Sequence, residues 1–337
     1  MPDIEIELYD AGALESESED LAFGDFGASE TYDAWSSEPA RQKVMRAIGA
    51  HPLGNKRKLT IGSQEIVDRI EALAELAPHF GETLGLIRRA ALLSMRTGVG
   101  LTIPPLLLVS EPGLGKTWLA RRLAEAIGVP MGEYSFASGD DPGVLTGHSL
   151  SWRGARTGLV AKALLFGDSA NPVVFIDEVD KSMSLNGEDP TDCLHALLEP
   201  ENARRYSDQF LELPIRADHV IWILTANTVE DLKPSQVDRT LVMRIERPTD
   251  DQQERVLQSI VDEALGSYRD SQLAISPEAF RRLLECSPRV ANRIVELALG
   301  YAVADERRSL EKAVASVARF EPGAALALVA DIAVGVL

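Results

Sequence analysis

Eight residues, Ser110 to Thr117, have the types and the spacing needed to bind a phosphate group. They read Ser-Glu-Pro-Gly-Leu-Gly-Lys-Thr and lie between an apolar run at 106–109 and a helical pattern at 118–127. A glycine-rich turn that opens a helix directs backbone N–H groups and the positive end of the helix dipole at an anion. Lys116 supports this interpretation, because a cation in the first helical turn opposes the dipole, at about 0.3–1 kcal/mol, unless a phosphate lies beside it. The sequence therefore predicts a loop that binds a nucleotide.

The loop departs from the pattern G-x-x-x-x-G-K-[ST] at its first position, where Ser110 replaces glycine. Serine can occupy this position if its φ angle stays negative. Glu111 adds a negative charge close to the expected phosphates. A chance Gly-Lys-Thr turn in an unrelated fold is the alternative for this segment alone, and the motifs downstream must decide.

Two carboxylates follow the next apolar run. Residues 173–176 are apolar without alternation, as in a parallel strand buried on both faces, and Asp177 and Glu178 come directly after them. The carboxyl ends of parallel strands form the ligand-binding edge of such a sheet. We expect Asp177 to hold Mg²⁺ through its water shell together with the Thr117 hydroxyl, and Glu178 to polarise the attacking water. A charged strand end without a ligand is the alternative.

Three further polar residues stand where they could serve the same chemistry. Asn227 follows an apolar run at 220–224 and is suited to orient water against a γ-phosphate, although a turn-forming asparagine has the same local pattern. Arg239 closes a short helical turn, as a surface charge or as an arginine finger. Arg289 stands at the start of a helix capped by Ser287, and a cation at this position indicates an external anion.

A glycine-punctuated stretch at 147–158 carries Trp152 and Arg153. Glycines on both sides of Trp152 favour a loop. A large aromatic side chain on such a loop either packs into the core of its own domain or contacts something outside it. The local sequence leaves both possibilities open.

The composition predicts a globular protein of two or three domains, since 337 residues carry 45% apolar and 26% charged side chains. Cys193 and Cys286 have no ligand-like spacing, so neither a disulfide framework nor a zinc site is expected. The start of the sequence has no basic segment followed by an apolar one, as an export signal would have. No run of 18 apolar residues, as needed to span a membrane, occurs anywhere in the sequence. We therefore expect a cytoplasmic protein.

The charge is unevenly distributed. Residues 1–40 hold twelve Asp and Glu and no Lys or Arg, which leaves −6 of the net −18 for the remaining chain. This composition predicts a disordered acidic arm, either a solvated tail or, through its aromatic residues, a segment that docks on a partner. Six Lys and Arg and no acid follow within 41–58, a stretch that could clasp the arm or an anionic partner.

The periodicity predicts three regions. Residues 1–60 form the acidic extension and a basic linker. Residues 61–249 comprise a helical lead-in, with amphipathic patterns at 64–77 and 83–95, and an α/β P-loop domain with a central parallel sheet. Residues 250–337 are helical by pattern and form a small all-helical lid domain.

The stretch from about 104 to 300 resembles the AAA+ module of Lon-type ATP-dependent proteases. Beyond the phosphate loop, the resemblance rests on order and spacing of the following motifs: Gly147-His148, Trp152-Arg153-Gly154, Thr157-Gly158, Phe175-Ile176-Asp177-Glu178-Val179-Asp180-Lys181, Asp189-Pro190, Ala196-Leu197-Leu198-Glu199-Pro200-Glu201-Asn202, Asp208, Phe210-Leu211, Thr225-Ala226-Asn227-Thr228 and Asp238-Arg239.

The resemblance implies a role for each matching position. It makes Lys116 and Thr117 the Walker A residues, Asp177 and Glu178 the Walker B pair, Asn227 the first sensor and Arg289 the second. It makes Arg239 the finger offered to a neighbouring subunit, and Trp152 with Arg153 the pore loop that grips a polypeptide threaded through a hexameric ring. The implied ATP-binding residues are Glu111, Pro112, Gly113, Leu114, Gly115, Lys116, Thr117, Trp118 and Arg289, with Thr117 and Asp177 for Mg²⁺.

The implied activity is ATP hydrolysis by a chaperone-like motor that remodels or unfolds a protein partner. Only 48 residues follow Arg289, so we expect a Lon-type motor without its Ser-Lys protease domain, and not a protease by itself. A nucleic-acid-associated switch ATPase and a nucleotide-binding scaffold with little turnover are the alternatives. The acidic arm counts against nucleic acid, which needs clustered cations, while the 41–58 stretch keeps that alternative open.

Overall fold

The structure is a computed structural model, and it describes residues 4–14, 38–138, 141–182, 189–266 and 277–304. Most of the predicted acidic arm and the residues from 305 onward lie outside these ranges. The described residues divide into two compact units. The first lies within Met1–Ile70, Leu86–Ser110 and Thr117–Arg244, and the second within Glu71–Gly85, Glu111–Lys116 and Ile245–Leu337.

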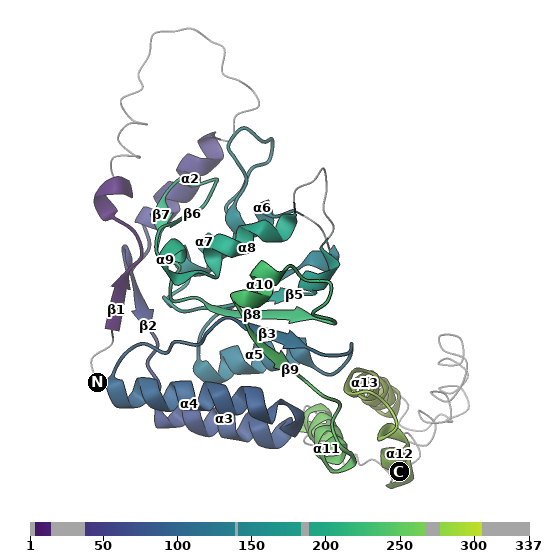
Figure 1. The fold of residues 1–337 in the computed structure, drawn as a ribbon. Coiled ribbons are helices and arrows are strands. Elements are labelled where there is room, and N and C mark those ends of the chain that lie inside the picture. The colour runs from purple at the N-terminus through teal and green to yellow at the C-terminus, as the bar shows by residue number, and fades with distance from the viewer. Residues whose placement is uncertain (1–3, 15–37, 139–140, 183–188, 267–276, 305–337) are drawn as a thin grey trace, which may run out of the picture. The chain divides into compact units, whose positions relative to one another are not determined.

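A five-stranded parallel sheet forms the centre of the first unit (Figure 1). Its strands, in spatial order, are β4 (Met131–Ser135), β5 (Val173–Asp177), β8 (Ile221–Ala226), β3 (Leu106–Val109) and β9 (Leu241–Arg244). All four neighbouring pairs run parallel. The predicted α/β fold with a central parallel sheet is therefore confirmed.

The central strands of the sheet are apolar at every position except Asp177 at the end of β5 and Thr225 near the end of β8, as expected for a sheet buried on both faces. Successive side chains point to opposite faces. On one face, Val174, Ile176 and Trp222 join a core that includes residues of α7 (Leu159–Leu165) and α8 (Cys193–Leu197). Figure 1 shows α5 (Lys116–Ile127) on the other side of the sheet.

The first unit also contains short elements that connect the strands. These are η2 (Phe136–Ser138), α6 (Gly143–Thr146), η3 (Val179–Lys181), η4 (Pro190–Asp192), α9 (Pro200–Ala203), β6 (Tyr206–Ser207), β7 (Pro214–Ile215) and α10 (Pro234–Asp238). Strands β6 and β7 pair antiparallel.

The N-terminal residues differ from the expectation of a disordered extension followed by a linker. β1 (Ile4–Glu7) pairs antiparallel with β2 (Lys56–Leu59), and α2 (Glu38–Gly49) precedes β2. The register places acids opposite bases, with Glu5 across from Lys58. Leu8 and Tyr9 then enter the main core. Residues 4–14 and 38–60 thus belong to the folded unit, because acids of the arm pair across the sheet with bases of the predicted linker.

Two of the six cations of the 41–58 stretch are buried. Arg41 donates through Nε and Nη2 to the Leu211 carbonyl, at 3.1 and 2.8 Å. Arg57 is fully buried and donates to the carbonyls of Gly54, at 2.9 Å, and Leu164, at 3.0 Å. These guanidinium groups hold the fold together, which leaves fewer cations for an anionic partner.

The residues of the predicted helical lead-in form α3 (Gln64–Leu76), η1 (Pro78–Phe80) and α4 (Gly81–Thr97). C-terminal to the sheet come three helices, α11 (Asp250–Gly266), α12 (Pro277–Leu283) and α13 (Pro288–Ala304). They share an apolar core to which Leu257, Leu283 and Val295 belong. In the described part of the chain, no helix combines the length and the apolar character needed to span a membrane.

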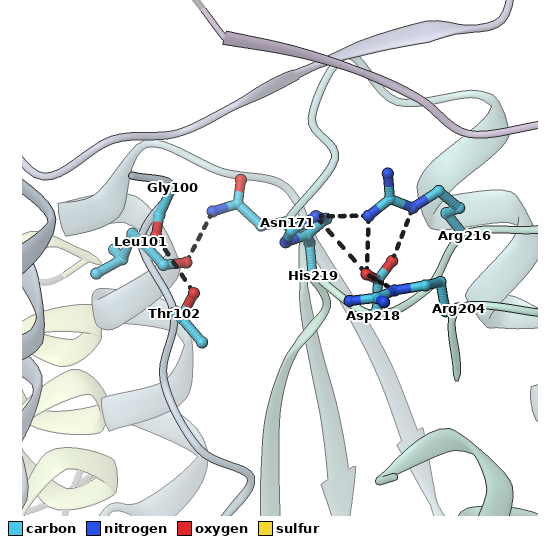
Figure 2. Close-up of polar contacts among 8 residues, drawn as sticks. All are labelled: Gly100, Leu101, Thr102, Asn171, Arg204, Arg216, Asp218 and His219. Carbon is cyan, nitrogen blue, oxygen red and sulfur yellow. Dashed lines mark hydrogen bonds and ion pairs between the residues drawn. The ribbon is translucent and has the colours of Figure 1, made fainter. Parts of the chain in front are cut away.

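A charged cluster lies just before the first residue of β8 (Figure 2). Its centre is the Asp218 carboxylate, which accepts from Arg204 Nε at 3.1 Å and Arg216 Nη2 at 2.8 Å. The His219 ring is 3.9 Å from the same carboxylate. Burial raises the pKa of Asp218, but the bonds from the two arginines and the charge of His219 outweigh it, so the net shift is downward.

Candidate functional site

The phosphate loop connects β3 directly to α5. Gly113 and Gly115 have φ angles of +90° and +92°, in the left-handed region where glycine is favoured. Among the described residues, the non-glycine positions with positive φ are Glu178 and Glu212, so Ser110 keeps a negative φ. Its N–H donates to the Ala226 carbonyl at the end of β8, at 3.3 Å. Serine therefore fits the first position of this loop without backbone strain.

The negative charge of Glu111 is matched by Arg247. The Arg247 Nε donates to Glu111 Oε2 at 2.7 Å, in an exposed ion pair. Lys116 begins α5 and is buried, with 9% of its surface exposed. The predicted ATP-binding residue Trp118 lies on the same helix, 6.0 Å below the Arg122 guanidinium.

The start of α13 contacts the phosphate loop within the second unit. The Arg289 N–H donates to the Gly113 carbonyl at 3.3 Å, and a Cβ atom on Gly113 would lie 3.4 Å from Ser287 Oγ. The Arg289 side chain is exposed and makes no hydrogen bond or ion pair with the described residues. The structure thus places the predicted second sensor beside the loop.

His79, on η1, is a contact of this loop that sequence reasoning missed. Its Nε2 lies 3.0 Å from the Leu114 carbonyl. Burial lowers the pKa of His79 and outweighs the opposing effect of the Leu114 bond, so the ring is neutral at neutral pH and donates through Nε2. Its Nδ1 is then a buried acceptor without a hydrogen-bond partner in the described chain.

The acid pair lies at the carboxyl end of β5, next to the end of β8. Asp177 is the last residue of β5, and Glu178 follows with φ +54°. The fully buried Thr225 hydroxyl accepts from the Glu178 N–H at 2.9 Å and donates to Asp177 Oδ1. One hydroxyl thus holds the Asp177 carboxylate and the Glu178 backbone, and Thr225 is a functional candidate that the sequence reasoning did not single out.

Asn227 and Thr117 complete this edge of the first unit. Asn227 directly follows β8 and is half-buried, and Thr117 lies in the first turn of α5. In the described residues, no group of three His, Cys, Asp or Glu side chains could hold a metal by itself. One carboxylate and one hydroxyl are a donor set that suits Mg²⁺ shared with nucleotide phosphates and water, so the residues fit that ion.

Arg239 lies at the end of α10, and its side-chain bonds go to residues other than Asp177 and Glu178. Its Nε donates to Glu199 Oε2 at 3.1 Å, and Nη1 donates to the Ser235 carbonyl at 2.9 Å. Lys233, at the start of α10, pairs with Asp189 at 3.0 Å. Arg239 therefore belongs to a polar strip between α10 and the 189–199 segment, and no bond joins it to Glu178.

Trp152 is 65% exposed, which excludes the first of the two possibilities that the sequence left open, packing into the core of its own domain. The side chain does not pack into the core, and its ring contact is with His148, at 6.3 Å between centroids. Arg153 beside it is also exposed. The loop presents both residues on the surface of this chain.

The geometry agrees with the comparison to known proteins. The model of the ATPase family associated with various cellular activities (AAA) matches residues 106–249, from the start of β3 to the residue before α11. The chain therefore contains an AAA ATPase domain.

Within this class, the domain is similar to that of Lon proteases. The Lon protease of Heliobacterium modesticaldum is 34% identical over 185 residues, which are 54% of this chain and 23% of that protein. The Lon protease of Clostridium beijerinckii is 30% identical over 218 residues, 64% of this chain and 26% of the relative. This chain thus spans about a quarter of the length of the relatives it matches.

Proposed function

We propose that this chain is a Mg²⁺-dependent ATPase that works as a hexameric ring of identical subunits and remodels a protein client. The observation that carries the ATPase part is the acid pair held by Thr225 at the end of β5, together with the glycine conformations of the phosphate loop. The family match supports it.

Each residue has a proposed task. Residues 111–118 bind the nucleotide, with backbone N–H groups of the loop and the Lys116 ammonium on its phosphates. Thr117 and Asp177 hold the metal, and Mg²⁺, when bound, neutralises charge on the β- and γ-phosphates. Glu178 takes the proton from the attacking water, and Asn227 orients that water.

The two arginines act on the phosphates from different places. Arg289 reaches the γ-phosphate from the start of α13, consistent with its contact to Gly113 and its exposed side chain. Arg239, which bonds Glu199 and Ser235 within its own chain, acts on the nucleotide of a neighbouring subunit. A finger supplied by a neighbour stabilises transition-state charge and couples hydrolysis to ring assembly.

A polypeptide client is favoured by the exposed Trp152 loop. An exposed aromatic side chain can grip an unfolded chain, whereas phosphate binding requires clustered cations. The burial of Arg41 and Arg57 removes two cations from the basic stretch that kept nucleic acid open.

The experiment compares Trp152→Ala with the parent protein. We expect an unchanged melting temperature and ATPase rate, and loss of ATP-dependent unfolding of a tagged fluorescent protein. Phe166→Ala, which removes another exposed aromatic side chain outside the proposed nucleotide-binding residues, is the control. Remodelling at the parental rate by Trp152→Ala would contradict the motor, and stimulation by single-stranded DNA or RNA would favour the switch ATPase. Negligible turnover in the parent would favour the scaffold.

A further inference from the structure

The two ends of the Trp152 loop, defined as residues 147–158, meet at one buried carboxylate. Asp208 is fully buried, and its Oδ2 accepts from the Gly158 N–H at 2.8 Å. The same carboxylate lies against Gly147 at the other end of the loop, where an added Cβ would come within 2.4 Å of Oδ1. Asp208 therefore touches both ends of the segment that carries Trp152.

Asp208 is also fixed from the core side. Its Oδ1 accepts from the N–H groups of Phe210 and Leu211, each at 3.0 Å. Phe210 and Leu211 are buried, with 1% and 0% of their surfaces exposed. A buried carboxylate is costly unless hydrogen bonds compensate it, and here three backbone donors offset part of that cost, although burial still raises the pKa of Asp208. The loop is thus tied to the packed core and not to another surface loop.

The two loop ends are closely packed, with no room for a side chain at Gly147 or Gly158. Gly147 has φ +86°, and a Cβ on Gly158 would lie 2.4 Å from both the Gly147 nitrogen and the Leu145 carbonyl oxygen. The Gln209 N–H donates to the Thr146 carbonyl at 2.8 Å, just before the loop begins. Glycine at 147 and 158 is what allows the two ends and the carboxylate to come together.

Above this base, the loop is shaped by its own backbone bonds: the Trp152 N–H donates to the Ser149 carbonyl at 2.9 Å and the Ala155 N–H to the Trp152 carbonyl at 3.1 Å. The His148 N–H donates to the Arg156 carbonyl at 3.1 Å, which closes the loop one step above Asp208. Between these positions, residues 151–154 are exposed, including Trp152. The loop therefore has an exposed tip, residues 151–154, and a buried base where Gly147 and Gly158 meet Asp208.

We propose that Asp208 is the positioning residue of the Trp152 loop: it anchors both loop ends to the core, so that movement of the domain is transmitted to Trp152. This inference rests on the proposed grip of Trp152 on a client. Asp208 touches neither the nucleotide-binding residues nor the client. Its removal therefore uncouples the loop and leaves ATP hydrolysis intact.

The first test needs no variant. Hydrogen exchange of the full-length protein, resolved by residue, should show the Gly158 amide exchanging at least about tenfold more slowly than the Gly154 amide at the tip, since a hydrogen-bonded buried N–H exchanges only when its bond opens. Equal exchange rates at the two glycines would overturn the anchor.

The second test compares Asp208→Asn with Asp218→Asn. Asp218 is a matched control because it is also a buried carboxylate with several donors, in a separate cluster (Figure 2). In Asp208→Asn, an amide nitrogen takes the place of the oxygen that accepts from the Gly158 N–H, and a nitrogen of this kind cannot accept a hydrogen bond. We therefore expect the hydrogen-exchange rate of the Gly158 amide and the rate of trypsin cleavage after Arg153 to rise about tenfold or more, as for a lost charge-assisted bond. Asp218→Asn should leave both rates unchanged.

The functional readout separates this inference from the proposed function. Asp208→Asn should hydrolyse ATP at the parental rate and lose at least about tenfold in client unfolding, with the loop loosened as above. If the loop loosens and client unfolding persists, Asp208 is structural only and the positioning role is wrong. If Trp152→Ala unfolds the client normally, the proposed grip itself fails, whatever the exchange data show. Should Asp208→Asn not fold, the exchange rates of the parent protein decide.

Discussion

Removing the Thr225 hydroxyl tests whether one buried side chain holds both acids of the catalytic edge. In Thr225→Val the side chain keeps its shape, but Asp177 Oδ1 loses its donor and the Glu178 N–H loses its acceptor. A hydrogen bond to a charged group is worth about 1.5–3 kcal/mol, so misplacement of the acids should slow turnover by about 10- to 100-fold. Nucleotide affinity should change little, because the phosphate loop does not depend on this hydroxyl.

The assay is steady-state ATP hydrolysis at saturating ATP, with nucleotide binding measured separately by fluorescence titration. Thr225→Ser is the matched control, since it keeps the hydroxyl and should recover most of the turnover. The free energy of unfolding of Thr225→Val should fall by about 1–3 kcal/mol, because a buried donor and acceptor lose their partner. Parental turnover in Thr225→Val, or equal losses in the Ser and Val variants, would refute the reasoning.

Three further predictions follow from the same structure. Arg239→Ala should lose about 10³-fold or more in turnover with nucleotide binding retained. If the finger acts in trans, mixing this variant with Glu178→Gln subunits should restore hydrolysis. Equal activity of dilute monomers and concentrated protein would contradict this. Deleting residues 2–14 should cost about 2–5 kcal/mol in chemical denaturation, because Leu8 and Tyr9 are buried, and an unchanged free energy of unfolding would contradict this. The pKa of Asp218 is lowered in the folded state, so the ionised Asp218 stabilises the fold above its unfolded pKa of about 3.9, and this stabilisation is lost as the pH falls through its folded-state pKa. Asp218→Asn should therefore flatten the decline of the urea midpoint between about pH 5 and pH 3. An unchanged slope would contradict the assignment.

Much of the α/β core was predictable because local sequence determines it. The runs at 106–109 and 173–176 are apolar without alternation, and the structure has β3 and β5 there. Polar residues that directly follow such strands, such as Asp177 and Asn227, must then lie at the carboxyl edge of the sheet. The helix start at Pro288 was also readable, from Ser287 and the proline itself.

The remaining features depend on contacts between distant residues. Glu5 and Lys58 are paired only because β1 and β2 come together, and the acidic composition around β1 by itself predicts disorder. Thr225 is an ordinary strand residue until β8 lies beside β5, and the Glu111–Arg247 pair joins residues far apart in the sequence. Asp208 is a single acid between two short strands, and only the fold shows that both ends of the Trp152 loop meet there.

The proposed role of Glu178 is to activate water for hydrolysis of the ATP that the phosphate loop binds, and comparing turnover with binding tests this role. ATP turnover and ATP binding are measured for the parent, Glu178→Gln and the control Glu212→Gln, whose glutamate has the same φ of +54° but is exposed on a loop. We predict that Glu178→Gln binds ATP with parental affinity and loses at least about 10²-fold in turnover, while Glu212→Gln behaves like the parent. Parental turnover in Glu178→Gln would contradict the account.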